Sequence, residues 1–183
     1  GNTTKLNAYV RNDIGGALAV SATLTVLPRP STNPGGDGPN QVSAGGFDDW
    51  MSREAAAHGE DVQKPEDDGD VDGFTVIVEY YLGLSPFLAD GSDAYYYERA
   101  GSGIALVFRS MHAATDVTVT PEWSDDLSTW QHSGETSSSG RRVDLRIDQF
   151  NSSDNFSMKR LTAASRSGGN EESLYLRLNV VRN

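Results

Sequence analysis

Four acidic residues and one glycine lie between positions 68 and 79 at the spacing of a twelve-residue calcium-binding loop. Asp68, Asp70 and Asp72 occupy loop positions 1, 3 and 5, and Glu79 occupies position 12. Calcium takes about six to eight oxygen ligands at flexible geometry, so alternating carboxylates and a late bidentate carboxylate suit it. Gly73 at position 6 permits the sharp turn at positive φ that a side chain would resist. The sequence therefore predicts a calcium site in this loop.

Two further positions of the loop affect the predicted ligand set. Phe74, at position 7, is expected to give its backbone carbonyl to the metal. Val76, at position 9, has no side-chain oxygen with which to hold a bridging water. The alternative is a solvated acidic turn, because Asp61, Glu66 and Asp67 make the surrounding chain acidic as well. Such a turn does not require Gly at position 6 or Glu at position 12, and we therefore favour the calcium site.

The predicted loop lies between two segments with helical patterns. The segment from Glu79 is expected to form a short apolar helix that ends at Gly83. A glycine in the left-handed conformation commonly follows the last residue of a helix. Before the loop, Phe47, Trp50 and Met51 recur at i, i+3 and i+4, which places them on one face of a helix. Helix, acidic loop and helix together make an EF-hand-like arrangement.

The segment DGDVDGFTVIVEYYLGLSP, from Asp68 to Pro86, resembles the pattern DxDGDGxxNxxEYxLGxDP of large secreted bacterial proteins. That pattern is related to dockerin and thrombospondin type 3 calcium repeats, and the resemblance implies bound calcium. The segment departs from the pattern at Val76, where the family often has Asn, and at Ser85, where the family has Asp. A dockerin carries two such loops as its cohesin-binding face. This chain has one, which favours a calcium-stiffened connector.

From about Tyr95 the chain has the pattern of an antiparallel β-sandwich. Strand-like runs separated by Ser, Gly, Asp and Asn cover residues 104–109, 117–123, 142–147 and 174–181. The last run places four apolar residues on one face, as a half-buried strand requires: Leu174, Leu176, Leu178 and Val180. The segments WSDDLSTW and LYLRLNV resemble signatures of the sandwich that often follows the calcium segment in the same secreted proteins.

The first 27 residues have the alternation of a β-hairpin, with a Gly-containing turn between two strand-like runs. Val10, Asn12, Gly15 and the segment 24–26 match the last two strands of bacterial immunoglobulin-like domains, which this region resembles. The resemblance implies that the chain starts inside a domain. Because an isolated hairpin is marginal in water, it needs a partner. Three partners remain open: missing upstream strands, the C-terminal sheet of this chain, or a neighbouring subunit through strand augmentation.

A proline- and glycine-rich stretch separates the hairpin from the calcium segment. Four prolines and three glycines in residues 28–39 prevent regular structure. The predicted fold is mainly β and has four segments: a hairpin in 1–27, a linker in 28–46, a calcium-binding connector in 47–90 and a sandwich module in 91–183.

Composition limits the classes of partner. The 183 residues carry a net charge of −11, which argues against nucleic acid because neutralising phosphates requires clustered Lys and Arg. No apolar run approaches the roughly 20 residues that cross a bilayer. The absence of cysteine is compatible with secretion if calcium and sheet burial supply the stability. We expect a soluble protein that is extracellular or at the cell surface.

The sequence contains no coherent catalytic set, and a non-enzymatic protein is predicted. His58, His112 and His132 lack metal-binding spacing and are expected at the surface, and there is no cysteine nucleophile. One prediction is a structural or adhesive module of an extracellular fibre or surface assembly, with self-association through the N-terminal hairpin. The alternative is a polysaccharide-binding accessory module of a secreted hydrolase, in which Trp123 and Trp130 form sugar platforms. Core packing is the favoured interpretation of these two tryptophans.

Overall fold

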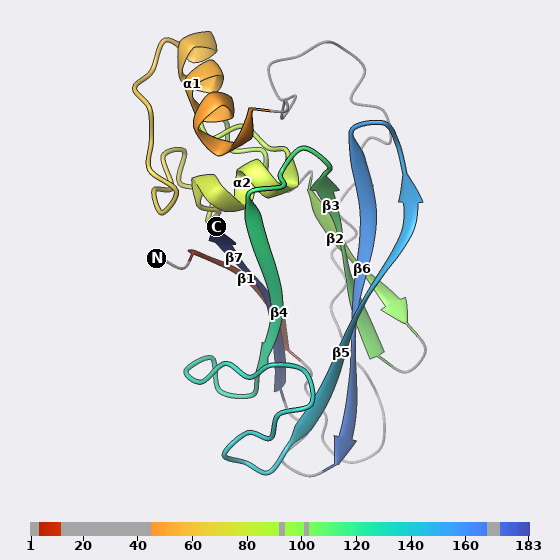
Figure 1. Ribbon diagram of the computed structural model, residues 1–183. Helices are drawn as coiled ribbons and strands as arrows, with labels where there is room; N and C mark the ends of the chain where they lie inside the picture. Colours follow the sequence, from red (N-terminus) through yellow and green to blue (C-terminus); the bar gives the residue numbers. More distant parts are fainter. Residues whose placement is uncertain (1–3, 12–44, 92–93, 101–102, 168–172) are drawn as a thin grey trace.

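The computed structural model describes residues 4–11, 45–91, 94–100, 103–167 and 173–183, and these residues form a mainly β protein (Figure 1). Along the described chain the elements are β1 (Thr4–Arg11), α1 (Gly46–His58), α2 (Val76–Leu82), β2 (Tyr95–Ala100), β3 (Gly103–Met111), β4 (Val117–Ser124), β5 (Arg142–Ser152), β6 (Phe156–Ser167) and β7 (Ser173–Arg182). Neither helix has the length and apolar character that crossing a membrane requires.

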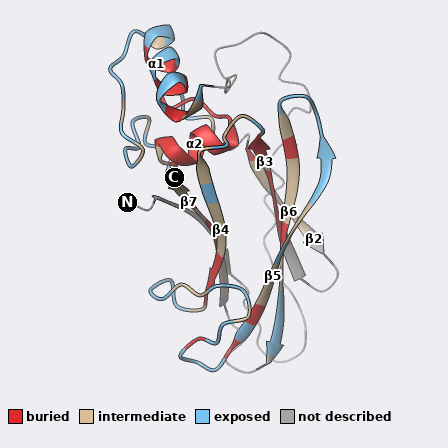
Figure 2. Cartoon of the chain, in the orientation of Figure 1, coloured by how far each residue is buried: buried red, intermediate tan, exposed pale blue. Residues whose placement is uncertain are grey.

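The strands form two antiparallel sheets, one with the order β1-β7-β4 and the other with the order β2-β3-β6-β5. Both sheets contribute buried side chains to a single hydrophobic core, which also includes side chains of both helices (Figure 2). The first sheet contributes Trp123 and Leu178 to this core, among other residues. The second sheet contributes Leu106, Phe108 and Leu161. The predicted mainly β class with antiparallel sheets is therefore confirmed.

Strand β1 pairs with the C-terminal strand of its own chain. It runs antiparallel to β7, with Thr4 opposite Val180 and Arg11 opposite Ser173. Among the three partners left open for the predicted hairpin, the structure shows the C-terminal sheet of the same chain. The predicted second strand of the hairpin, residues 22–26, and the linker as far as residue 44 lie outside the described residues.

The four strand-like runs predicted in the C-terminal half correspond to β3, β4, β5 and β7. Strand β2 was not among the predicted runs, and neither was strand β6. Its residues Ser157, Lys159 and Leu161 lie opposite Ser110, Phe108 and Leu106 of β3, so they share the face that enters the core. Because the first two of these core-facing positions are polar, β6 lacks the apolar alternation by which a strand is recognised.

Two short helices cover one end of the sheets. The predicted apolar face of α1 is confirmed, because Phe47, Trp50 and Met51 are all at most 2 % exposed. Every residue of α2 is buried, and this helix contacts β1, β3 and β7 (Figure 2). All residues of α2 except Glu79 are apolar or aromatic, and a helix of this composition is stable only inside a core, so α2 requires the sheets below it and α1 beside it.

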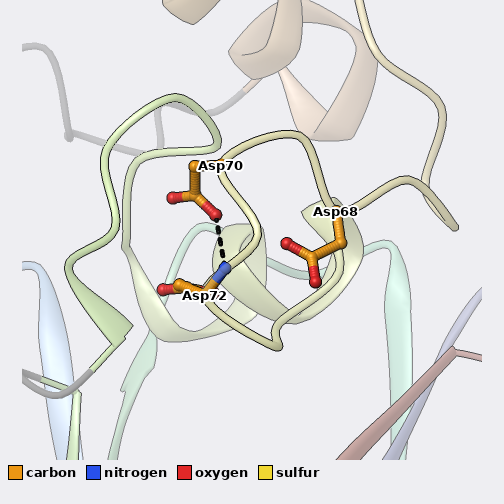
Figure 3. Close-up of side chains that lie close together, drawn as sticks. All are labelled: Asp68, Asp70 and Asp72. Atoms are coloured by element: carbon orange, nitrogen blue, oxygen red, sulfur yellow. Dashed lines mark hydrogen bonds between the residues drawn. The ribbon is translucent and has the colours of Figure 1, made fainter.

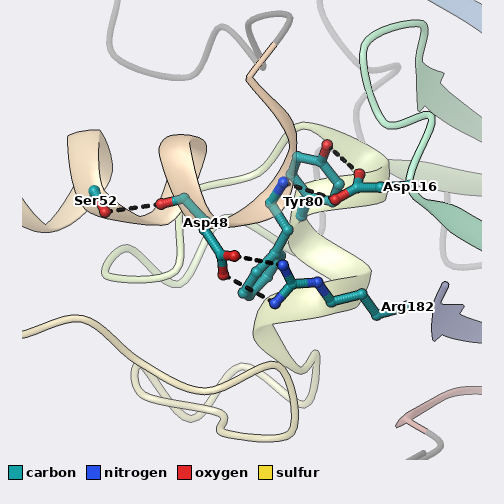
Figure 4. A network of polar contacts seen from close by, with 6 residues as sticks. Asp48, Ser52, Tyr80, Asp116 and Arg182 are labelled. Atoms are coloured by element: carbon teal, nitrogen blue, oxygen red, sulfur yellow. Dashed lines mark hydrogen bonds and ion pairs between the residues drawn. The ribbon is translucent and has the colours of Figure 1, made fainter.

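A polar network fastens the helices to the β-sheets (Figure 4). The Arg182 guanidinium donates two hydrogen bonds to the Asp48 carboxylate, at 2.9 and 2.5 Å. Asp116, in the turn between β3 and β4, accepts hydrogen bonds from the Tyr80 hydroxyl at 2.7 Å and the Phe47 amide at 2.9 Å. These contacts join α1 and α2 to the end of β7 and to the β3–β4 turn.

The buried carboxyl of Glu54 predicts a pH dependence of stability. Glu54 is 0 % exposed, both of its oxygens lack a hydrogen-bond partner among the described residues, and burial raises its pKa from 4.5 to about 7. Arg53 opposes this shift, Asp90 adds to it, and the His58 ring nitrogen lies 3.9 Å away. Because the folded pKa is the higher one, the stabilisation is complete below pH 4.5 and is lost as pH rises through about 7. The loss amounts to at most about 3 kcal/mol.

Glu54→Gln removes this titration, so we expect the variant to gain stability relative to the natural protein as pH rises. Urea unfolding at about pH 5 and about pH 8, in the same concentration of calcium, measures the difference. Glu60→Gln, a replacement of an exposed neighbour, is the matched control and should change neither value. Equal effects of Glu54→Gln at both pH values would show that Glu54 does not titrate in this range.

Candidate metal centre

Three aspartates of the predicted loop come together in the structure (Figure 3). Asp68, Asp70 and Asp72 each place one carboxylate oxygen within 4.8 Å of the others. Their oxygens also organise the loop backbone, because Asp70 accepts the Asp72 amide at 3.1 Å and Asp68 accepts the Gly73 amide at 3.2 Å. The loop is therefore folded around its carboxylates, with the remaining lone pairs left for a cation.

The two ends of the loop are tied together by backbone hydrogen bonds. The Val76 amide donates to the Asp67 carbonyl at 2.9 Å, and the Ile77 amide donates to the Pro65 carbonyl at 3.1 Å. Gly73 has a φ of 94°, which confirms the predicted positive φ at loop position 6. Val71 also has a positive φ, 61°, although a β-branched residue disfavours that conformation. The loop holds this strained residue in place while the chain turns back into α2.

Glu79 is buried beside the three aspartates without a hydrogen-bond partner. It extends from α2, is 1 % exposed, and neither of its carboxylate oxygens has a partner among the described residues. Burial raises the pKa of Glu79 to about 10, and Asp70 and Asp72 add to the shift. Its oxygens lie beside the three-aspartate group rather than within it. A buried carboxylate is normally paired or bound to a metal, so this residue requires a positive partner to be ionised.

Asp90 approaches the same site from outside the loop, and the sequence did not identify it. Its Oδ1 atom is buried without a partner among the described residues, while Oδ2 accepts a hydrogen bond from the Ser85 amide at 3.4 Å. Burial raises the pKa of Asp90 to about 6, and repulsion from Asp72 and Asp70 contributes. No spacing rule relates Asp90 to the loop. Only the turn that follows α2 brings it there.

Gly91 lies against the loop and shows how closely this turn packs. Its amide donates to Asp72 Oδ2 at 2.7 Å. A Cβ atom on Gly91 would lie 2.2 Å from a ring carbon of Phe74 and 2.5 Å from Asp72 Oδ2. The Phe74 side chain is buried, and its amide donates to Asp72 Oδ1 at 2.9 Å. Hence residues on either side of α2 form one packed unit around Asp72.

We expect Gly91→Ala to weaken calcium binding by at least about tenfold, because the methyl group would push away Phe74 and Asp72, and one factor of ten is about 1.4 kcal/mol. Calorimetric titration of the variant measures the effect. Gly69→Ala is the control, since the three atoms nearest to a Cβ there all belong to the end of the flexible Gln63 side chain. If Gly91→Ala bound calcium as tightly as the control, the contact between Gly91 and the loop would have no role in binding.

The residues present fit a hard divalent cation. Every candidate side-chain ligand is a carboxylate: Asp68, Asp70, Asp72, Glu79 and Asp90. Phe74 remains the predicted carbonyl ligand, at a position between the aspartates and α2. Carboxylate and carbonyl oxygens suit calcium, magnesium or manganese, whereas zinc and copper sites are usually built from His and Cys.

The two tryptophans that would be sugar platforms under the alternative function are both used in packing, which is the interpretation that the sequence favoured. Trp123 is 0 % exposed, and its indole N–H donates to the His132 carbonyl at 3.0 Å. Trp130 is half-buried, and the Arg177 guanidinium lies 4.0 Å from the centre of its ring. His112 and His132 are exposed, as expected for surface histidines, and His58 is half-buried. The structure does not bring Trp123 or Trp130 to the carboxylate cluster.

No family model, curated protein or solved structure matches this chain.

Proposed function

We propose that this chain is a non-enzymatic, secreted structural or adhesive module whose helical connector is locked by one calcium ion. Asp68, Asp70, Asp72, Glu79 and the Phe74 carbonyl would hold the ion, and Asp90 would complete its shell. One observation carries the proposal: Glu79 is buried, has no hydrogen-bond partner among the described residues, and lies beside three converging aspartates. A calcium ion supplies the positive charge that allows these carboxylates to converge.

The proposed role is mechanical. Glu79 belongs to α2, whose seven residues are all buried, and Tyr80 of the same helix bonds to Asp116 in the β3–β4 turn. Asp90 lies in the chain that leads from α2 into β2. Ligands on α2, on the preceding loop and on the following turn would therefore be fixed relative to one another. In this account the EF-hand-like unit sets the orientation of the chain before and after a β-sandwich module.

Assembly through β1 is the second part of the proposal. Strand β1 lies at the edge of its sheet and is joined to α1 through a long segment, residues 12–45. A strand attached in this way is suited to exchange with the same position in a second copy. Size measurement by light scattering, on the full chain and on a chain lacking residues 1–27, tests this. Association of the full chain, but not of the shortened chain, supports exchange. If both chains formed particles with the same number of copies, exchange would be refuted.

Thermal unfolding tests the metal lock. With calcium at about 100 times its dissociation constant, the folded state should gain about 2.7 kcal/mol, which appears as a raised melting temperature. Chelator should reverse the gain. Magnesium should give a smaller gain, because it requires near-octahedral geometry and gives up its waters reluctantly. An unchanged melting temperature in millimolar calcium would overturn the proposal.

A further inference from the structure

A cavity of about 580 Å³ is lined by the end of β5 and the start of β6, together with residues of β3, β4 and α2. It lies away from the aspartate loop, and none of its lining residues is a candidate metal ligand. Its walls come from both sheets and from α2. Val117 and Val119 belong to β4, Ser110 and Met111 to β3, and Tyr81 to α2. A volume of this size is typical of pockets that bind small molecules.

In three neighbouring strands, the residues whose side chains face the core form a row along the strand. Each row changes from apolar to polar where it reaches this cavity. On β6, Ser157 and Lys159 continue the row of the buried Leu161. On β3, Ser110 continues the row of Phe108 and Leu106, directly opposite Ser157. On β5, Gln149 continues the row of Ile147 and Leu145, directly opposite Lys159. Of these polar residues the two serines are buried, where facing sheets normally place apolar side chains, while Lys159 is half-buried and Gln149 is exposed at the mouth of the cavity.

These polar side chains are held in a fixed arrangement. The Ser157 hydroxyl is 2.7 Å from His112 Nε2, and the Ser152 hydroxyl is 3.4 Å from each of them. The Lys159 ammonium donates to the Tyr81 hydroxyl at 3.2 Å and lies 5.5 Å from the centre of the Tyr81 ring. Ser157 and Ser110 are at most 3 % exposed. The cavity is thus lined by ordered donors and acceptors.

The charge of the cavity is opposite to that of the chain. The sequence has 26 acidic and 15 basic residues, yet no Asp or Glu side chain lines this cavity. Lys159 does line it, and within the described residues Lys159 forms no salt bridge. Lys159 is half-buried and contacts Tyr81. Among the lining side chains Lys159 alone carries a fixed charge, so a charged ligand of this cavity is expected to be an anion.

We infer that this cavity binds a small hydroxylated carboxylate, of the uronic acid class, with its carboxylate on Lys159. Ser152, Ser157, His112 and Gln149 would meet the hydroxyl groups, and Met111, Val117 and Val119 would contact the C–H faces of the ring. This inference is independent of the metal site. It assigns sugar binding to residues other than Trp123 and Trp130, which are occupied in packing.

Titration of the full chain, in calcium, with galacturonate tests the inference by amide chemical shifts. We expect shifts at Ser157 and Lys159, and weaker effects with galactose and with sulfate, which lack the carboxylate or the ring. Lys159→Met keeps the stem that packs on Tyr81 and removes the charge. It should lower the affinity by about tenfold or more, because a charge-assisted hydrogen bond is lost.

Arg146→Met is the matched control, because Arg146 projects from the opposite face of β5 and its side chain is 77 % exposed. It should bind galacturonate like the natural chain. Melting temperatures of both variants establish that they are folded. The inference fails if galacturonate shifts no cavity residue at about 10 mM, where a millimolar site would be populated. It also fails if galactose or sulfate binds as tightly, or if Lys159→Met has no effect.

Discussion

Replacing Glu79 with Gln is expected to abolish calcium-induced stabilisation without destabilising the metal-free protein. Glu79 would be the bidentate ligand at loop position 12, and it is buried next to Asp70 and Asp72. Loss of a residue that merely supports a ligand costs about 10–100-fold in metal affinity, so loss of the ligand itself should cost at least about 100-fold. The melting temperature of Glu79→Gln should therefore not respond to calcium that raises the melting temperature of the natural chain.

In the absence of metal, Glu79→Gln should not lower the stability of the fold. Because the folded pKa of Glu79 is raised to about 10, its ordinary value being 4.5, the stabilisation is complete below pH 4.5 and declines as pH rises toward 10. At neutral pH the buried Glu79 carboxyl therefore lowers the stability of the metal-free natural protein. A neutral amide at the same position avoids this loss. We expect Glu79→Gln in chelator to melt at the same temperature as the natural chain or above it.

The two measurements together separate a metal ligand from a structural residue. Asp61→Asn is the matched control, because it removes one charge from an exposed position before the loop. That variant should keep the full calcium response. If Glu79→Gln melted below the natural chain in chelator and still gained stability with calcium, Glu79 would be a packing residue and not a ligand.

Replacing Arg177 with Met is expected to destabilise the fold by about 3–5 kcal/mol, since removal of one partner leaves the other charge buried. Glu122 and Arg177 lie opposite each other on β4 and β7 and are 6 % and 4 % exposed. The guanidinium donates to Glu122 Oε2 at 2.5 Å and packs against the Trp130 ring. Asn179 donates to the other carboxylate oxygen at 3.1 Å. Urea unfolding in calcium measures the loss.

A double replacement provides the control for this prediction. Combining Arg177→Met with Glu122→Leu removes both charges, so much of the lost stability should return. Arg146→Met breaks an exposed pair with Asp148 and should cost no more than about 1 kcal/mol. If the double variant were no more stable than Arg177→Met, packing of the arginine on Trp130 would account for the loss instead of the unpaired Glu122.

Local signals predicted the position of α1 and the C-terminal end of α2, although α2 begins at Val76 and not at Glu79. The left-handed Gly83 that ends α2, with a φ of 70°, the positive φ of Gly73 and the buried face of α1 all follow from short-range spacing. The stronger strands were recognisable because their apolar residues alternate over several positions. In each of these elements the local preference agrees with the final fold.

The missed features depend on contacts between distant segments. Asp90 reaches the aspartate loop only because α2 ends and the chain folds back, and no sequence spacing encodes that approach. Strand β6 was missed because Ser157 and Lys159 occupy core-facing positions. Such conflicts between local pattern and global position are expected at functional sites, and here the conflict coincides with the cavity beside α2. The pairing of β1 with β7 was one of three alternatives left open by the sequence, because it requires contact between distant segments of the chain.

Calorimetric titration of the metal-free chain with calcium tests the central claim most directly. We expect one ion per chain, with a dissociation constant between about micromolar and millimolar, the range of calcium sensors and extracellular modules. The heat should vanish when Asp70→Ala is combined with Glu79→Gln. Absence of binding up to about 10 mM, beyond the weak extracellular range, would contradict the account and leave residues 68–79 as an acidic turn.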